Sequence, residues 1–209
     1  MRIAVCDVGL GNIRSVERAL HAACRGRAVD IEVTGEPERI RTADRLVVPG
    51  QGAFRDCSRA LSGALGEAVR AHIEAERPYL GLCLGLQILF GSSEEATGCA
   101  GLGILEGEVV RLKGGSDPMN GTALKIPHMG WNAVHPTDRS GLLAAQPHHF
   151  YFVHSFVVVP RDPAVVAGTT EYGDRFVSAV TRGNLFACQF HPEKSQRAGL
   201  ELLERFLES

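Results

Sequence analysis

The sequence predicts an α/β protein with a central, mostly parallel sheet, flanking helices and an antiparallel extension in the second half of the chain. In the first half, short runs that are apolar on both faces alternate with segments of helical periodicity. This alternation is typical of parallel strands covered by helices on both sides. Past about residue 100, apolar runs follow one another with only turn residues between them, which favours hairpins.

The bulk composition agrees with an ordinary globular fold. The 209 residues are 44% hydrophobic and 22% charged, which suits one substantial core, and we expect residues 1–209 to form a single domain. A net charge of -2 gives no electrostatic reason to expect nucleic acid or an anionic membrane as partner. The first apolar run is interrupted at Asp7, too early for a signal peptide or a membrane span, so we expect a cytoplasmic protein.

The individual elements follow in order from these patterns. In the first half, the expected strands are residues 2–8, 29–34, 44–50 and 79–82, and the expected helices are residues 12–23, 54–76 and 84–96. In the second half, the expected strands are residues 104–112, 131–136, 150–160, 164–173, 175–183 and 185–192, followed by an amphipathic helix at 195–209.

The stretch PYLGLCLGLQILF, residues 78–90, places Cys83 between Gly81 and Gly85. A G-x-C-x-G pattern between an apolar strand and a helix is the thiol counterpart of the G-x-S-x-G nucleophile elbow. The glycines permit a sharp turn, and the start of the helix favours a thiolate. The alternative is a cysteine packed among leucines, and this motif alone leaves the two interpretations evenly balanced. Most of the six cysteines are expected to be reduced and structural.

A second motif, QFHPEKS, supplies a base and an acid. Pro192 biases His191 toward extended backbone, so His191 and Glu193 are expected to point to the same side. The carboxylate can then orient the imidazole, which exchanges a proton with a nucleophile elsewhere in the fold. A solvated surface turn is the better interpretation of this short motif alone. Together with Cys83, however, it completes a Cys–His–Glu triad, and the balance reverses.

A third motif, VVPGQGAF, ends a predicted strand in a glycine-rich loop. Backbone N–H groups near Gly52, with the N–H of Leu84, are placed to hold a developing oxyanion if the loop lies beside the nucleophile. An ordinary turn between a strand and a helix is about equally compatible with the sequence.

The remaining polar motifs predict neither a cofactor nor a metal. Arg14 occupies the third-glycine position of a dinucleotide-binding pattern, which excludes that motif. His148, His149 and His154 lie in one segment without an accompanying carboxylate or thiolate pattern. The single tryptophan, Trp131, is interpreted either as part of a turn that enters a strand or as an exposed aromatic suited to a partner surface.

Taken in order, PGQGAF, GLCLGLQILF and QFHPEKS resemble the class I, triad-type glutamine amidotransferases, and the resemblance covers essentially the whole chain. Within this class, GNIRSV, IPHMGWN, YFVHS and HPEKSQ resemble the glutaminase subunit of imidazole glycerol phosphate synthase in histidine biosynthesis. The resemblance implies a flavodoxin-like fold, glutamine as substrate, and a separate cyclase subunit as the partner that receives ammonia.

The resemblance also implies roles for individual residues. Cys83 attacks the glutamine side-chain amide, His191 acts as base and then as acid, and Glu193 orients His191. Backbone N–H groups near Gly52 and Leu84 hold the oxyanion. The implied substrate contacts are Gln87, His154 and Ser155, and the implied cyclase-facing residues are Asn12, Trp131 and Lys194. The departures from the family pattern are mild: Phe156 stands where tyrosine is commoner, and Gln51 occupies a variable place.

Two other functions are compatible with parts of this pattern. One is a stand-alone thiol hydrolase or peptidase, against which the IPHMGWN and YFVHS segments count. The other is a non-catalytic binding module, which has no chemical need for Cys83, His191 and Glu193 together.

Overall fold

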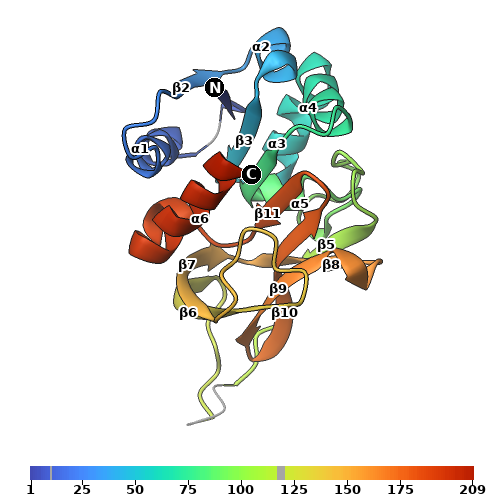
Figure 1. The fold of residues 1–209 in the computed structure, drawn as a ribbon. Helices are drawn as coiled ribbons and strands as arrows, with labels where there is room; N and C mark the ends of the chain where they lie inside the picture. The colour runs from blue at the N-terminus through green and yellow to red at the C-terminus, as the bar shows by residue number, and fades with distance from the viewer. Residues whose placement is uncertain (10, 117–120) are drawn as a thin grey trace.

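The computed structural model describes residues 1–9, 11–116 and 121–209 (Figure 1). Within these residues, eleven strands form one mixed sheet, in the order β2-β1-β3-β4-β11-β10-β9-β6-β7, with β8 joined to β10 and β5 joined to β8. The strands of its first part are β1 (Arg2–Cys6), β2 (Asp30–Thr34), β3 (Arg45–Gly50), β4 (Tyr79–Cys83) and β11 (Leu185–Cys188). They pair in parallel, which confirms the predicted fold class.

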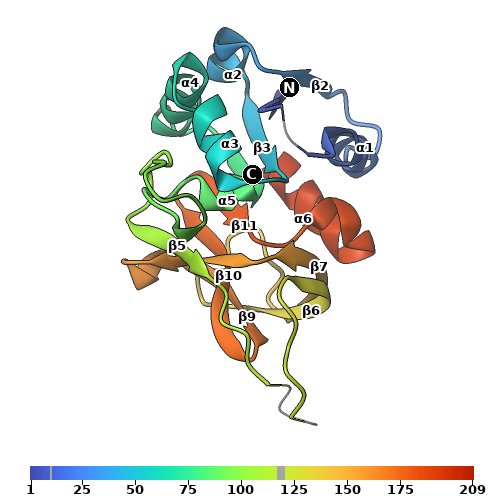
Figure 2. The same ribbon diagram turned by 180° about the vertical axis from the view of Figure 1, so that it is seen from behind.

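Helices cover both faces of this parallel part (Figures 1 and 2). They are α1 (Ile13–Ala23), α2 (Pro37–Thr42), α3 (Phe54–Ala60), α4 (Ala64–Glu74), α5 (Leu84–Gln87) and α6 (Gln196–Glu208). Because side chains alternate along a strand, Ile3 and Val5 pack in the core that contains α1 and α6. Ala4 and Cys6 pack in the core that contains α2, α3 and α4.

The second half of the chain is antiparallel. Its strands are β5 (Gly107–Arg111), β6 (His128–Pro136), β7 (His148–His154), β8 (Phe156–Pro160), β9 (Val166–Tyr172) and β10 (Asp174–Arg182). The single strand expected at 150–160 is divided at Ser155, because β7 pairs with β6 whereas β8 pairs with β5 and β10. Short 3-10 helices are η1 (Glu94–Ala96), η2 (Pro163–Val165) and η3 (Pro192–Lys194). In the described part of the chain, no helix is long and apolar enough to cross a membrane.

Two predicted helices are shorter than expected, and α2 was not predicted. The segment 54–76 is divided into α3 and α4, since Gly63 has a non-helical backbone with φ −133° and ψ −145°. The helix expected at 84–96 ends with α5 at Gln87. Just after this end, the carbonyls of Ile88 and Leu89 accept hydrogen bonds from the backbone N–H groups of Leu102 and Ile104. These bonds to a distant loop take the place of the hydrogen bonds that would continue the helix.

Candidate active site

Cys83 lies on a sharp turn between β4 and α5, with φ 54° and ψ −102°. Such a backbone is uncommon for any residue except glycine, and strain of this kind concentrates at functional sites. The flanking glycines make the turn possible. A Cβ on Gly81 would lie 2.5 Å from the carbonyl oxygen of Gly85, and a Cβ on Gly85 would lie 1.9 Å from the carbonyl oxygen of Val48.

His191 and Glu193 form a buried pair beside this turn. The Nδ1 of His191 lies 2.8 Å from Oε1 of Glu193, and each side chain is only 2% exposed. His191 is extended, with φ −108° and ψ 93°. The prediction that the extended backbone continues to Glu193 is wrong, however, because Pro192–Lys194 forms the 3-10 helix η3. The 3-10 turn, rather than strand alternation, brings the carboxylate to the imidazole.

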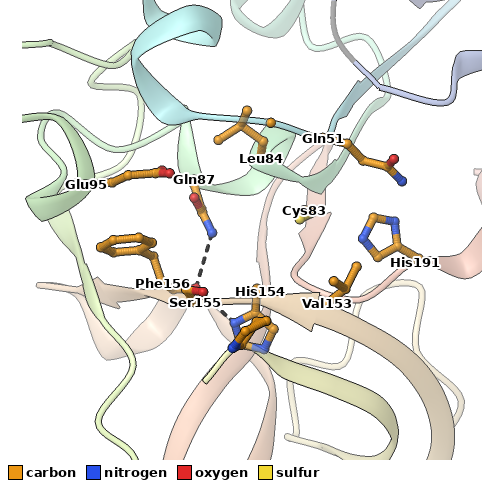
Figure 3. Close-up of a pocket in the computed structure, with 12 residues that line it drawn as sticks. Gln51, Cys83, Leu84, Gln87, Glu95, Val153, His154, Ser155, Phe156 and His191 are labelled. Atoms are coloured by element: carbon orange, nitrogen blue, oxygen red, sulfur yellow. Dashed lines mark hydrogen bonds between the residues drawn. The ribbon is translucent and has the colours of Figure 1, made fainter. Parts of the chain in front are cut away.

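The second ring nitrogen of His191 faces Cys83 (Figure 3). Within the described residues, this Nε2 is buried and has no hydrogen-bond partner of ordinary geometry. Burial by itself lowers the pKa of His191, but the Cys83 sulfur and the Glu193 carboxylate raise this pKa to about 9. At neutral pH the ring therefore holds its proton, and an imidazolium next to sulfur stabilises a thiolate.

A cavity of about 330 Å³ opens in front of Cys83 and His191 (Figure 3). Its size falls at the small end of ligand cavities. The residues that line it are Gln51, Gly52, Cys83, Leu84, Gln87, Glu95, Pro127, Val153, His154, Ser155, Phe156 and His191. The cavity thus brings together parts of all three sequence motifs and the three implied substrate contacts.

Backbone donors border the same cavity. Leu84 is the first residue of α5, where N–H groups have no partner inside a helix. Gly50 pairs with Cys83 across β3 and β4, and a Cβ on Gly50 would lie 2.6 Å from Cβ of Leu84. Gly52 follows with φ 130°, a backbone that favours glycine. The glycine-rich loop therefore packs directly against the start of α5, the helix that follows Cys83.

His154 is buried in the cavity wall and is hydrogen-bonded to His128, a residue that no sequence motif predicted as part of the site. The Nδ1 of His154 lies 3.0 Å from the carbonyl oxygen of Phe156, and its Nε2 lies 3.0 Å from Nδ1 of His128. Because a carbonyl only accepts, Nδ1 of His154 donates and its Nε2 accepts from His128. Burial lowers the pKa of His154 to about 3 and that of His128 to about 4, so both rings are neutral.

This histidine pair predicts a loss of stability in mild acid. In the unfolded chain, the His154 ring binds a proton below about pH 6.5. In the folded protein, the same ring stays neutral down to about pH 3. The free energy of unfolding should therefore fall by about 2 kcal/mol between pH 6.5 and 5 because of this one ring. Urea unfolding at the two pH values should show a smaller loss in His154→Gln, while the exposed His149→Gln serves as control. An equal pH dependence in both variants would contradict the assignment.

The three implied partner-facing residues lie outside the cavity. Asn12 is exposed and caps α1, because its Oδ1 accepts from the N–H of Ser15 at 3.3 Å. Trp131 is 47% exposed on β6, next to Met129, which is 61% exposed. Lys194 is half-buried in η3, directly after the carboxylate that holds His191.

Comparison with known proteins identifies the family. A family model described as glutamine amidotransferase class-I matches residues 5–209. The chain belongs to the class-I glutamine amidotransferases. In this family, a relative from Methylococcus capsulatus called imidazole glycerol phosphate synthase subunit HisH is 49% identical over 98% of this chain and 95% of its own length. A relative of the same name from Nitrosomonas europaea is 50% identical, with 98% of this chain and 97% of the relative covered.

A solved structure, a crystal structure of a glutamine amidotransferase, shares the fold. Its TM-score is 0.73 with 21% sequence identity, and the match covers 99% of this chain and 97% of the other. The described part of the chain thus has the fold of this glutamine amidotransferase. The two HisH relatives confirm the resemblance to the glutaminase subunit of imidazole glycerol phosphate synthase.

Proposed function

We propose that this chain is the glutaminase subunit of imidazole glycerol phosphate synthase. It hydrolyses glutamine to glutamate and ammonia, and it supplies the ammonia to a cyclase subunit in histidine biosynthesis. The observation that carries the proposal is the strained Cys83, which lies in a cavity beside the buried His191–Glu193 pair in a chain whose relatives are named as subunits of that synthase.

The reaction follows from the arrangement of the triad. The sulfur of Cys83 attacks the amide carbon of glutamine, and a carbon–sulfur bond forms while the carbonyl oxygen becomes an oxyanion. His191 gives its proton to the amide nitrogen, the carbon–nitrogen bond breaks, and ammonia leaves. His191 next takes a proton from water, the resulting hydroxide attacks the γ-glutamyl thioester, and glutamate and the thiolate are released.

The groups around the triad support these steps. We assign the oxyanion to the backbone N–H groups near Gly52 and Leu84, since donors fixed in place before the reaction stabilise charge as it develops. We assign substrate contacts to Gln87, His154 and Ser155, which line the cavity. The side-chain NH₂ of Gln87 donates to the Phe156 carbonyl and to Oε1 of Gln189, so the side-chain oxygen of Gln87 is the group that remains for an N–H of the substrate glutamine.

We assign the cyclase-facing surface to Asn12, Trp131 and Lys194. Tyr151 connects this surface to the triad, because its ring packs edge-on against Trp131 with centroids 6.2 Å apart and its carbonyl accepts from the N–H of His191 at 2.9 Å. An aromatic side chain such as Trp131 is a favourable anchor for a partner. We also propose that residues 1–209 form one amidotransferase domain. The cytoplasmic location expected from the sequence stays a prediction.

The test of this function is glutamate release from glutamine, with and without a cyclase subunit and its nucleotide substrate. We expect release that the partner stimulates and that disappears in Cys83→Ala, because no other group replaces the attacking sulfur. The partly exposed Cys99→Ala is the matched control and should retain the activity of the original chain.

Two other results would contradict the proposal. Equal activity with and without the partner, extending to unrelated amides, would favour a stand-alone hydrolase. Absence of turnover even with the partner and its substrate would favour a binding module.

A further inference from the structure

Gln189 is a buried polar side chain to which the mechanism above gives no role. It follows β11 directly and is 0% exposed. Its Nε2 lies 3.4 Å from the sulfur of Cys83, within range for a hydrogen bond to sulfur. Its Oε1 lies 3.0 Å from Nε2 of Gln87. A glutamine amide thus contacts the sulfur of Cys83 in addition to His191.

The surrounding contacts determine which end of each amide faces which neighbour. The carbonyl oxygen of Phe156 can only accept, so the group of Gln87 that lies 3.2 Å from it must be the NH₂. The second hydrogen of that NH₂ points to Gln189, which must present its oxygen there. The NH₂ of Gln189 therefore faces Cys83. A chain of three hydrogen bonds, Cys83–Gln189–Gln87–Phe156, fixes a donor against the sulfur.

The backbone around Gln189 is also fixed. Its N–H donates to the carbonyl of Ser178 on β10 at 2.9 Å. The preceding residue, Cys188, pairs with Leu82 across β11 and β4, one position before the nucleophile. The distance between the two side chains is therefore set by neighbouring strands of the sheet rather than by a loop.

We propose that Gln189 is a further catalytic residue, which stabilises the Cys83 thiolate with its side-chain N–H and holds the sulfur toward the substrate, with Gln87 as the residue that orients it. Cys83 is only 8% exposed, and a buried anion needs hydrogen bonds to replace those of water. A neutral amide supplies one without competing with Glu193 for His191. The expected effect of Gln189 on turnover rests on the proposed glutaminase function. The contact between Gln189 and the Cys83 sulfur does not depend on that function.

The test compares Gln189→Leu, which keeps the approximate size and removes the donor, with Ser178→Ala. Ser178 is buried and its hydroxyl has no partner within the described residues, so its loss leaves the amide chain intact. Two quantities are measured in each variant: partner-stimulated kcat and KM for glutamine, and the pH at which iodoacetamide alkylates Cys83 at half its maximal rate, followed by mass spectrometry of the peptide that contains Cys83.

We expect Gln189→Leu to lower kcat by about 10- to 100-fold, the equivalent of one hydrogen bond to a charged group, with a much smaller change in KM. The alkylation midpoint should rise by about 1 to 2 pH units. Gln87→Leu should shift the midpoint in the same direction by less, because it frees the Gln189 amide to rotate. Adding Gln87→Leu to Gln189→Leu should shift the midpoint no further, and Ser178→Ala should match the original chain.

An unchanged alkylation midpoint in a Gln189→Leu protein that melts like Ser178→Ala would overturn the proposal. If Gln189→Leu does not fold, the midpoint of Gln87→Leu decides instead, and no shift there overturns the proposal equally. Failure of the glutaminase function is recognised separately. In that case the original chain releases no glutamate, while the alkylation midpoints still report on the contact between Gln189 and Cys83.

Discussion

Glu193→Ala is expected to lower partner-stimulated glutamine hydrolysis by about 10³- to 10⁴-fold, whereas Cys83→Ala should remove about 10⁶-fold or all measurable activity. The difference arises because Glu193 acts through His191. Its Oε1, 2.8 Å from Nδ1, selects the tautomer and orientation of the ring, and a misdirected imidazole still transfers protons occasionally. Glu193→Gln should lose less than Glu193→Ala, since an amide oxygen can still accept from Nδ1.

The same substitution should change the pH dependence in a definite direction. The pKa of His191 is raised to about 9, above its ordinary value of about 6.5. The stability that this shift contributes is fully present below pH 6.5 and is lost as the pH rises through 9. In Glu193→Ala that alkaline loss should shrink, and the alkaline limb of the rate profile should move to lower pH. If well-folded Glu193→Ala lost as much activity as Cys83→Ala, the expected ranking of these two variants would be contradicted.

Gly85→Ala is expected to destabilise the fold by about 4 kcal/mol or more, a large share of the stability of a typical domain. A Cβ at this position would lie 1.9 Å from the carbonyl oxygen and 3.0 Å from the carbonyl carbon of Val48. This carbonyl is part of the main chain of β3, and Val48 is fully buried. The carbonyl therefore cannot rotate away as a flexible side chain would. Either the turn at Cys83 or the strand must move.

The measurement is the denaturant midpoint of Gly85→Ala against that of Gly91→Ala. Gly91 is exposed, and a Cβ there would meet nothing within 4 Å, so this control should change stability by no more than about 0.5 kcal/mol. Alanine has the better helix propensity, which by itself would make Gly85→Ala stabilising inside α5. Similar midpoints for the two variants would show that β3 and the turn can separate without cost.

The sequence predicts the alternating first half and the turn at Cys83 because both depend on local pattern. Apolar strands and amphipathic helices have different periods, and a cysteine between glycines marks a sharp turn. The early end of α5 depends instead on Leu102 and Ile104, whose N–H groups bind the carbonyls of Ile88 and Leu89. Such contacts between distant segments leave no trace in the periodicity of either segment.

The same limit applies to the site. His191 and Glu193 were predicted as a pair because they are two residues apart, although η3 replaces the expected extended backbone. His128 and Gln189 were missed as functional neighbours, because their contacts depend on which strands lie side by side. The local signal for Gln189 was its place in QFHPEKS, as a polar residue inside the buried run 185–192.

The position of β11 in the sheet has a consequence for how the protein is made. Of the described strands, β11 is the last in chain order, yet it lies in the interior of the sheet between β4 and β10. While the chain emerges from the ribosome, β4 therefore remains an unprotected edge until residues 185–188 arrive. His191 and Glu193 arrive only after them. A chain interrupted before residue 185 lacks both β11 and His191, so under the proposed mechanism an incomplete molecule can neither close the sheet nor release ammonia.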